Sequence, residues 1–211
     1  MSYACFKKYI FCAAIVVVVS AQTMLGQTRK PLTYVIGAGI SSINQPGDLS
    51  KYWNSGFTFG LALERNFTRT SLVTSYSYSY STFDDRAWLN SDTATASYQT
   101  LYNTSNVTYF YFGENVRYNF PSRTALSLFV DAGIGYFHIG GGETVATKDS
   151  TQSVLIRHPG IDKGAFQFNV GAGIRIATGK ETALIVMVRE VFASTKPDRT
   201  QYMPLEIAVE F

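Results

Sequence analysis

The sequence contains little cysteine, proline or charge. Of its 211 residues, 2 are cysteine, 6 are proline and 16% are charged, while 46% are hydrophobic. Low charge and few prolines exclude a disordered chain. Cys5 and Cys12 both lie within the first 21 residues. A mature chain without that segment therefore has no disulfide, no thiolate nucleophile and no metal site with cysteine ligands.

Residues 1–21 predict a cleaved signal peptide. Lys7 and Lys8 form a positive start, residues 9–19 form an unbroken apolar run, and small residues follow, which is the pattern of a secretory signal. The alternative is a membrane anchor, but the run is about 11 residues long, whereas a helix that spans a bilayer needs roughly 20. We therefore expect export.

The remaining chain is expected to be one domain. Residues 22–30 form a short N-terminal segment, and residues 31–211 form the folded part. Loss of Lys7 and Lys8 lowers the formal net charge from +3 to about +1. That charge is too balanced for a nucleic-acid-binding protein, so we expect no nucleic-acid partner.

Alternating residues dominate the chain after position 22. In residues 166–176 every even position is apolar and every odd position is polar or glycine, which is typical of a strand with two different faces. Similar runs recur about eight times, and the phase of the seventh, which is apolar on both faces, stays open. The expected strands are 32–42, 56–66, 70–82, 106–120, 124–138, 166–176, 181–193 and 201–211.

The connections between these strands alternate between short and long. Short ones contain Gly, Pro or Asn, as tight turns do, and the long ones are polar. The short ones are 66–69, 121–123 and 178–180, and the long ones are 43–55, 83–105, 139–163 and 194–200. This alternation is typical of an antiparallel up-and-down barrel whose two ends face different compartments.

The two faces of the strands differ in size. One carries glycine and serine, and the other carries Phe, Tyr, Leu and Ile. A narrow eight-stranded lumen is not expected to hold so many rings, so the bulky face should point outward, where only lipid stabilises it. The alternative is a soluble barrel or sandwich with an aromatic core. We predict an all-β fold, an eight-stranded antiparallel up-and-down transmembrane β-barrel.

The strand phases also predict which polar residues point inward. Opposite charges in a dry, narrow lumen must pair. A structural network of ion pairs is the expected role, and a gated ion path is the alternative. The predicted members are Glu64, Asn115, Arg117, Asp131, Asn169, Arg175, Arg189, Glu206 and Glu210.

The chain ends on an aromatic residue with apolar residues in phase before it: Leu205, Ile207, Val209 and Phe211. With this ending and the repeated strands, residues 31–211 resemble small bacterial outer-membrane barrels of the OmpX-like and OmpA-membrane-domain type. The resemblance implies a Gram-negative outer membrane, contact with its lipid and lipopolysaccharide, and a C-terminal signal for the barrel assembly machinery. Pro204 and Glu206 depart from the family pattern. Because Pro204 lacks an N–H, an irregular start of the last strand is expected.

No residues are assigned to catalysis, a cofactor or a metal. Some barrels of this type modify lipid A with a rim histidine, a serine and a carboxylate. Here the run at His138 continues Ile139-Gly140 and lacks the serine. Asp84 and Asp85 are the candidate carboxylates to meet His138 at the rim. His158 lies in a long loop, and no His or carboxylate cluster has the spacing of metal ligands.

The expected function is a structural or surface-interaction role through the long external loops, with an unknown ligand. Aromatic residues in these loops are candidate contact residues or anchors at the membrane interface: Tyr52, Trp53, Trp88, Tyr98 and Tyr102. Two alternatives remain open. One is a narrow pore or lateral path for small molecules, and the other is a lipid-A acyl hydrolase or transferase.

Overall fold

The computed structural model describes residues 32–45, 51–67, 69–92, 95, 97–122, 124–148, 155–179, 182–195 and 199–211. All of them belong to one unit, Leu32–Phe211. The predicted signal peptide and the segment 22–30 lie outside the described residues, so both stay predictions.

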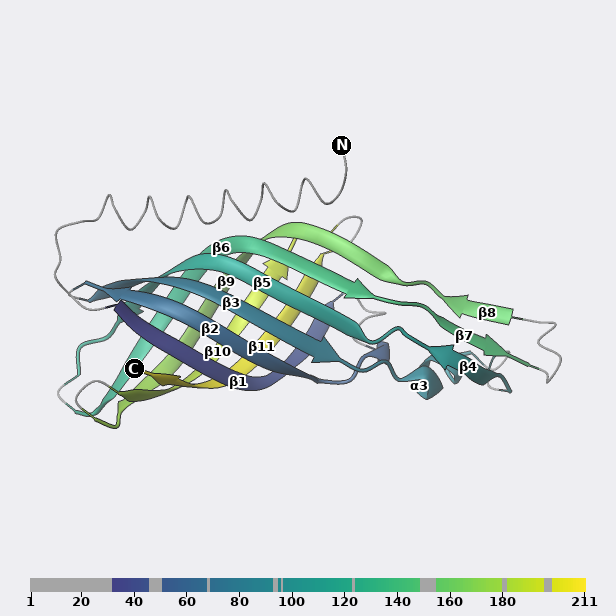
Figure 1. Cartoon of the computed structure of the whole chain (residues 1–211), viewed down its shortest axis with the longest axis horizontal. Helices are drawn as coiled ribbons and strands as arrows, with labels where there is room; N and C mark the ends of the chain where they lie inside the picture. The colour runs from purple at the N-terminus through teal and green to yellow at the C-terminus, as the bar shows by residue number, and fades with distance from the viewer. Residues whose placement is uncertain are drawn as a thin grey trace. The chain divides into compact units, whose positions relative to one another are not determined.

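Eight antiparallel strands close into a barrel in the order β1-β11-β10-β9-β6-β5-β3-β2 (Figure 1). The prediction of an eight-stranded up-and-down barrel is confirmed. The barrel closes where Tyr34 and Phe211 exchange two backbone hydrogen bonds of 2.9 and 3.0 Å. The strands are β1 (Leu32–Gln45), β2 (Gly56–Asn66), β3 (Thr70–Ser81), β5 (Val107–Asn119), β6 (Leu126–Gly141), β9 (Ile161–Ala177), β10 (Ala183–Ala193) and β11 (Thr200–Glu210).

The two ends of the barrel differ, as the connection lengths predict. The short-turn end carries the connections 67–69, 120–125 and 178–182, together with Leu32 and Phe211. The long-loop end carries the other connections. The open question about the seventh strand is also settled: the odd positions of β10 from Ala183 to Ala193 are buried, except for Met187, which is partly buried.

The long connections contain secondary structure that their sequence did not predict. A second sheet of three strands, β4 (Gln99–Asn103), β7 (Thr144–Thr147) and β8 (Leu155–His158), has the order β4-β7-β8. A short helix, α3 (Asp85–Leu89), precedes it. These strands have four or five residues, too few for alternation to stand out. No helix in the described part of the chain is long and apolar enough to cross a membrane.

The barrel interior holds more aromatic rings than expected. The expectation that the narrow lumen leaves the bulky rings on the outward face is wrong for five of them, which are buried inside: Tyr109, Tyr111, Phe129, Phe137 and Tyr202. Glycines make room for two of them, Phe129 and Tyr111, which lie against Gly173 and Gly113. At Gly173, for example, a Cβ atom would overlap the ring of Phe129. Inward glycines therefore provide the space that the rings occupy.

Pro204 interrupts the pairing of β10 with β11. The register runs through Val188–Leu205 and resumes at Val191–Tyr202, so the two intervening pairs are absent. Proline has no N–H to donate to this ladder. The same residue still pairs with Ser41 of β1. On the β1 side the register shifts only between Ile43 and Gln45, opposite Tyr202 and Gln201, so Pro204 itself interrupts the pairing with β10 alone.

We predict that Gly173→Ala lowers the free energy of unfolding by about 1–3 kcal/mol, because the added methyl group overpacks the contact with Phe129. Gly60→Ala is the matched control. Its Cβ would meet only the flexible carboxylate of Glu206, 3.3 Å from Oε2, so the free energy should change by less than about 1 kcal/mol. Urea titrations in lipid vesicles, followed by tryptophan fluorescence, measure both. Equal losses in the two variants would contradict this packing.

Candidate functional site

A chain of buried ion pairs crosses the barrel interior. Arg117 Nη1 lies 2.7 Å from Glu64 Oε2, and Arg117 Nη2 lies 3.1 Å from Asp131 Oδ2. Arg189 Nη2 reaches the same Oδ2 atom at 3.2 Å. These four side chains come from β2, β5, β6 and β10. The pairs therefore link strands that are far apart in the sequence.

A second pair lies at the short-turn end. Arg175 donates two hydrogen bonds to Glu210, from Nε to Oε2 at 2.7 Å and from Nη2 to Oε1 at 2.6 Å. The Arg175 side chain is 37% exposed, whereas that of Glu210 is 4% exposed. This bidentate pair closes the network toward solvent.

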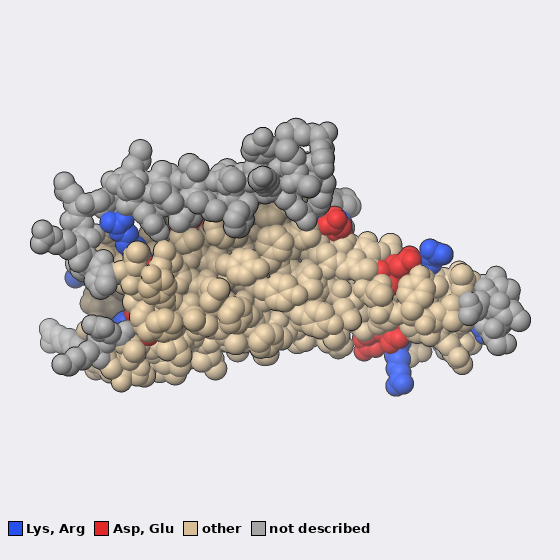
Figure 2. All heavy atoms as spheres, in the orientation of Figure 1, with Lys and Arg blue, Asp and Glu red and all other residues tan. Residues whose placement is uncertain are grey.

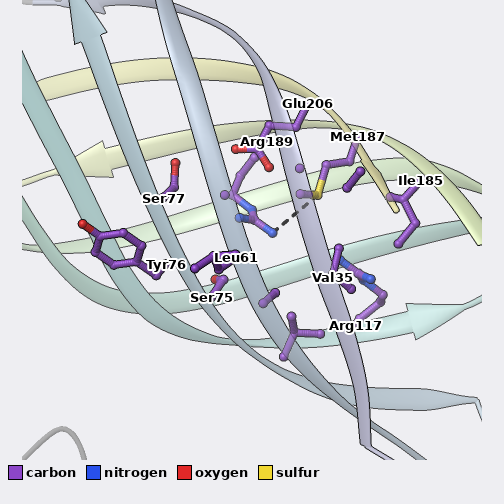
Figure 3. Close-up of a pocket in the computed structure, with 15 residues that line it drawn as sticks. Val35, Leu61, Ser75, Tyr76, Ser77, Arg117, Ile185, Met187, Arg189 and Glu206 are labelled. Carbon is purple, nitrogen blue, oxygen red and sulfur yellow. Dashed lines mark hydrogen bonds between the residues drawn. The ribbon is translucent and has the colours of Figure 1, made fainter. Parts of the chain in front are cut away.

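Glu206 is the lumen carboxylate without an ion pair among the described residues. It is buried, and its Oε1 atom has no hydrogen-bond partner. Figure 3 shows it beside Arg189 at a small cavity of about 20 Å³, which Arg117, Ser75 and Ser77 also line. A cavity of this size holds about one water molecule. The lumen is therefore packed rather than open.

A layer of amides surrounds Tyr111. Its hydroxyl oxygen accepts hydrogen bonds from Ser75 Oγ at 3.0 Å, Asn115 Nδ2 at 2.9 Å and Asn169 Nδ2 at 3.3 Å. Gln167 is also fully buried. The serine face that carries Ser75 was expected to point inward, whereas Tyr111 and Gln167 were not among the predicted lumen residues. Tyr111 and Asn115 both occupy odd positions of the same strand and so lie on the same face of the sheet, which is the pattern that could have predicted an inward Tyr111.

An apolar cluster fills the lumen at the long-loop end. Its buried members include Ile43, Val107, Tyr109, Phe137 and Tyr202. The rings of Tyr109 and Tyr202 pack edge to face, with centroids 4.9 Å apart. The cluster fills the lumen at this level, and the hydroxyl of Tyr109 within it is hydrogen-bonded to Ser41 and Ser81.

The outward face is apolar and exposed. Phe166 is 62% exposed, Ile40 59% and Val116 58%. On the face in Figure 2, charged side chains gather toward the two ends, and the wall between them is nearly free of charge. Such a band is stable only in hydrocarbon.

The rim histidine has a different partner from the one expected. His138 Nε2 lies 2.9 Å from Asp162 Oδ1, and its ring stacks on Phe110 with centroids 5.2 Å apart. Asp84 instead caps α3, where its Oδ1 accepts a hydrogen bond from the N–H of Ala87. The structure therefore does not join Asp84 to His138.

Three long connections meet in an aromatic cluster. The ring of His158 lies 4.9 Å from Phe83, 5.2 Å from Trp53 and 5.6 Å from Trp88, centroid to centroid. Trp53 is 7% exposed and donates from Nε1 to the carbonyl of Ser105 at 2.7 Å. Because it is buried, Trp53 is not a surface contact residue, contrary to one of the expected roles.

The structure places eight of the nine expected lumen residues in the buried class, and the ninth, Arg175, is partly exposed at the short-turn end. Leu205, Ile207, Val209 and Phe211 are all exposed on the outward face. Among the residues that the structure describes, no group of three or more His, Cys, Asp or Glu side chains is placed to hold a metal ion.

We predict that Asp131→Asn lowers the free energy of unfolding by about 3–5 kcal/mol, because Arg117 and Arg189 lose the charge that they share. Glu206→Gln should change it by less than about 1 kcal/mol, because Glu206 has no ion pair to lose. Urea unfolding in vesicles, with heat-modifiable gel migration as the check of folding, compares the two. A similar loss in both variants would contradict the assigned pairing.

Comparisons with known proteins agree with this geometry. The family model described as "Outer membrane protein beta-barrel domain" matches residues 10–201. Neisserial surface protein A has a TM-score of 0.61 and 9% identity, over 85% of this chain and 95% of that structure. That likeness shows a shared fold. No curated protein matches the sequence.

Two further solved structures have lower scores. Ail of Yersinia pestis has a TM-score of 0.47 and 10% identity, over 85% of this chain and 97% of that structure. The outer membrane enzyme PagL has a TM-score of 0.41 and 15% identity, over 84% of this chain and 98% of that structure. The family match covers most of the sequence, and the barrel and its apolar wall fit it. The chain is therefore a bacterial outer-membrane protein and belongs to the outer membrane protein beta-barrel domain family.

Proposed function

We propose that the barrel is a closed platform that holds a folded interaction surface outside the cell. The observation that carries this proposal is the contrast between the two parts of the molecule. Ion pairs fill the lumen toward the short-turn end, and an apolar cluster fills it at the long-loop end. The long connections, by contrast, form an ordered sheet. In this family the long loops face the exterior and the short turns face the periplasm.

The interaction surface is the sheet β4-β7-β8, called here the cap. Its central strand β7 is buried at all four positions, while Leu101, Tyr102 and Leu155 on the outer strands are 39%, 44% and 44% exposed. Tyr102 donates a hydrogen bond of 2.7 Å to Glu143, and this bond raises the pKa of the phenol above its usual value. Exposed apolar and aromatic side chains on a rigid frame suit the binding of another macromolecule.

The remaining partners follow from the membrane setting. The apolar wall is proposed to contact outer-membrane lipid and, in the outer leaflet, lipopolysaccharide. Leu205, Ile207, Val209 and Phe211 are proposed to be the C-terminal signal for the barrel assembly machinery. Their exposure on the outward face, between 44% and 57%, supports this role because a strand-end signal must be readable from outside the sheet.

We propose that the chain is not an enzyme. An acyl hydrolase or transferase needs a nucleophile within hydrogen-bond reach of its base. Asp162 orients His138, but among the described residues the Nδ1 atom of His138 has no hydrogen-bonding hydroxyl. The exposed dyad therefore lacks the third group that acyl transfer requires.

We predict that the purified protein is silent in planar bilayers, because its lumen is sealed by the apolar cluster. Single-channel recording in 1 M KCl tests this, with a 16-stranded porin under the same conditions as the positive control. Discrete conductance steps that persist across preparations would favour the narrow-pore alternative and contradict a closed platform.

We predict that the triple variant Leu101→Ser, Tyr102→Ser, Leu155→Ser loses the proteins that the wild-type chain retains from outer-membrane and extracellular-matrix fractions in a pull-down. Phe120→Ser, at the short-turn end and 44% exposed, is the control and should retain them. Heat-modifiable migration checks that every variant folds. Retention of the same proteins by the triple variant would show that the cap is not the interaction surface.

A further inference from the structure

A groove of about 410 Å³ runs along the outward face of the barrel. It crosses β1, β2, β3 and β5, and residues that matter for its shape are Tyr34, Leu63, Thr74, Tyr76, Phe112 and Phe211. Its floor is formed by Val35, Ala62 and Ser75, which occupy inward-facing positions of their strands. The groove is therefore a hollow in the surface that faces the membrane.

A short side chain creates this hollow. Thr74 lies between Leu72 and Tyr76 along β3, and it pairs with Leu63 of β2 and Glu114 of β5. These four neighbouring side chains are all longer than that of Thr74, so the outward surface of the barrel is recessed at Thr74. The hydroxyl of Thr74 donates a 2.8 Å hydrogen bond to Glu114 Oε1, so its polar atom is already satisfied. The groove thus presents an almost wholly apolar surface.

One end of the groove lies at the short-turn end of the barrel. There the rings of Tyr34 and Phe211 stack, with centroids 6.4 Å apart and planes 24° apart. Tyr34 is 55% exposed. Aromatic residues of this kind mark the level of the lipid head groups, and the short turns of such barrels face the periplasm. The groove therefore rises from the periplasmic interface into the hydrocarbon layer.

We propose that this groove binds one acyl chain of a phospholipid from the periplasmic leaflet. The Thr74 hydroxyl in this hollow already donates to Glu114, so a peptide backbone or water would find few hydrogen-bond partners there, and neither enters hydrocarbon without such partners. An acyl chain is apolar, linear and present at that depth. Its head group would lie beside Tyr34 and Phe211, while the chain follows β2 and β3 toward Tyr76 and Phe112.

Two substitutions at Thr74 distinguish the effect of the groove's shape from the effect of the hydrogen bond between Thr74 and Glu114. Thr74→Phe fills the hollow. Thr74→Val removes the hydroxyl but keeps the volume, so it should leave chain binding unchanged. Val170→Phe adds the same ring to the outward face of β9, which lies across the barrel from β2 in the strand order, and is the control for added bulk.

The test uses the full mature chain in vesicles of phosphatidylethanolamine and phosphatidylglycerol at a 3:1 ratio. A small fraction of the phospholipid carries a diazirine at mid-chain, and mass spectrometry maps the crosslinks after illumination. We expect crosslinks on β2 and β3 near Leu63 and Tyr76 to exceed those on β9 at least threefold. Thr74→Phe should abolish that excess, while Thr74→Val and Val170→Phe should retain it.

Three results would overturn the proposal. Crosslinks spread evenly around the wall would show ordinary solvation by lipid. An excess that survives Thr74→Phe would place the chain elsewhere. An absence of lipid adducts at the groove would show that no acyl chain occupies it. Should Thr74→Phe fail the gel-migration check of folding, Thr74→Leu provides a smaller fill with the same expected loss. None of these outcomes depends on the role of the cap.

Discussion

The pairing of backbone N–H and C=O groups is the constraint on which this structure depends. Hydrocarbon offers no substitute partner, so every strand edge must be paired and the sheet must close. The pairing of β1 with β11, which ends in the two hydrogen bonds between Tyr34 and Phe211, meets this requirement. The interruption opposite Pro204 is the exception, and beside it the side chain of Gln201 donates a 2.6 Å hydrogen bond to Glu190 across the same two strands.

Closure of the sheet also limits which side chains can pack inside the lumen. Eight strands enclose a narrow space, and the chain fills it in layers. Ion pairs around Arg117 occupy the part nearer the short turns, amides surround Tyr111, and apolar rings occupy the long-loop end. Buried charges are tolerated because each arginine has an acidic partner. Within the described part of the chain Glu206 makes no ion pair, and it borders the small cavity.

The two ends of the barrel have different consequences for function. The connections at one end are short, whereas the long connections at the other end build a sheet and an aromatic cluster around His158. That cluster ties three connections together, so the cap stands on an ordered base. A packed lumen beneath an ordered cap fits the proposed surface role.

Much of this architecture could be read from the sequence. The period-two runs predicted all eight barrel strands, the outward apolar face and the burial of Glu64, Arg117 and Asp131, because alternation is a local property of one strand. Inner rings such as Phe129 were missed, since the space for them depends on a glycine in another strand. The cap strands were missed because they are too short to show a period. The sequence alone therefore determined which residues face the membrane. Which residues meet each other, such as His138 with Asp162 or Thr74 with Glu114, was decided only by the register of the closed sheet, which brings together strands that no local pattern relates.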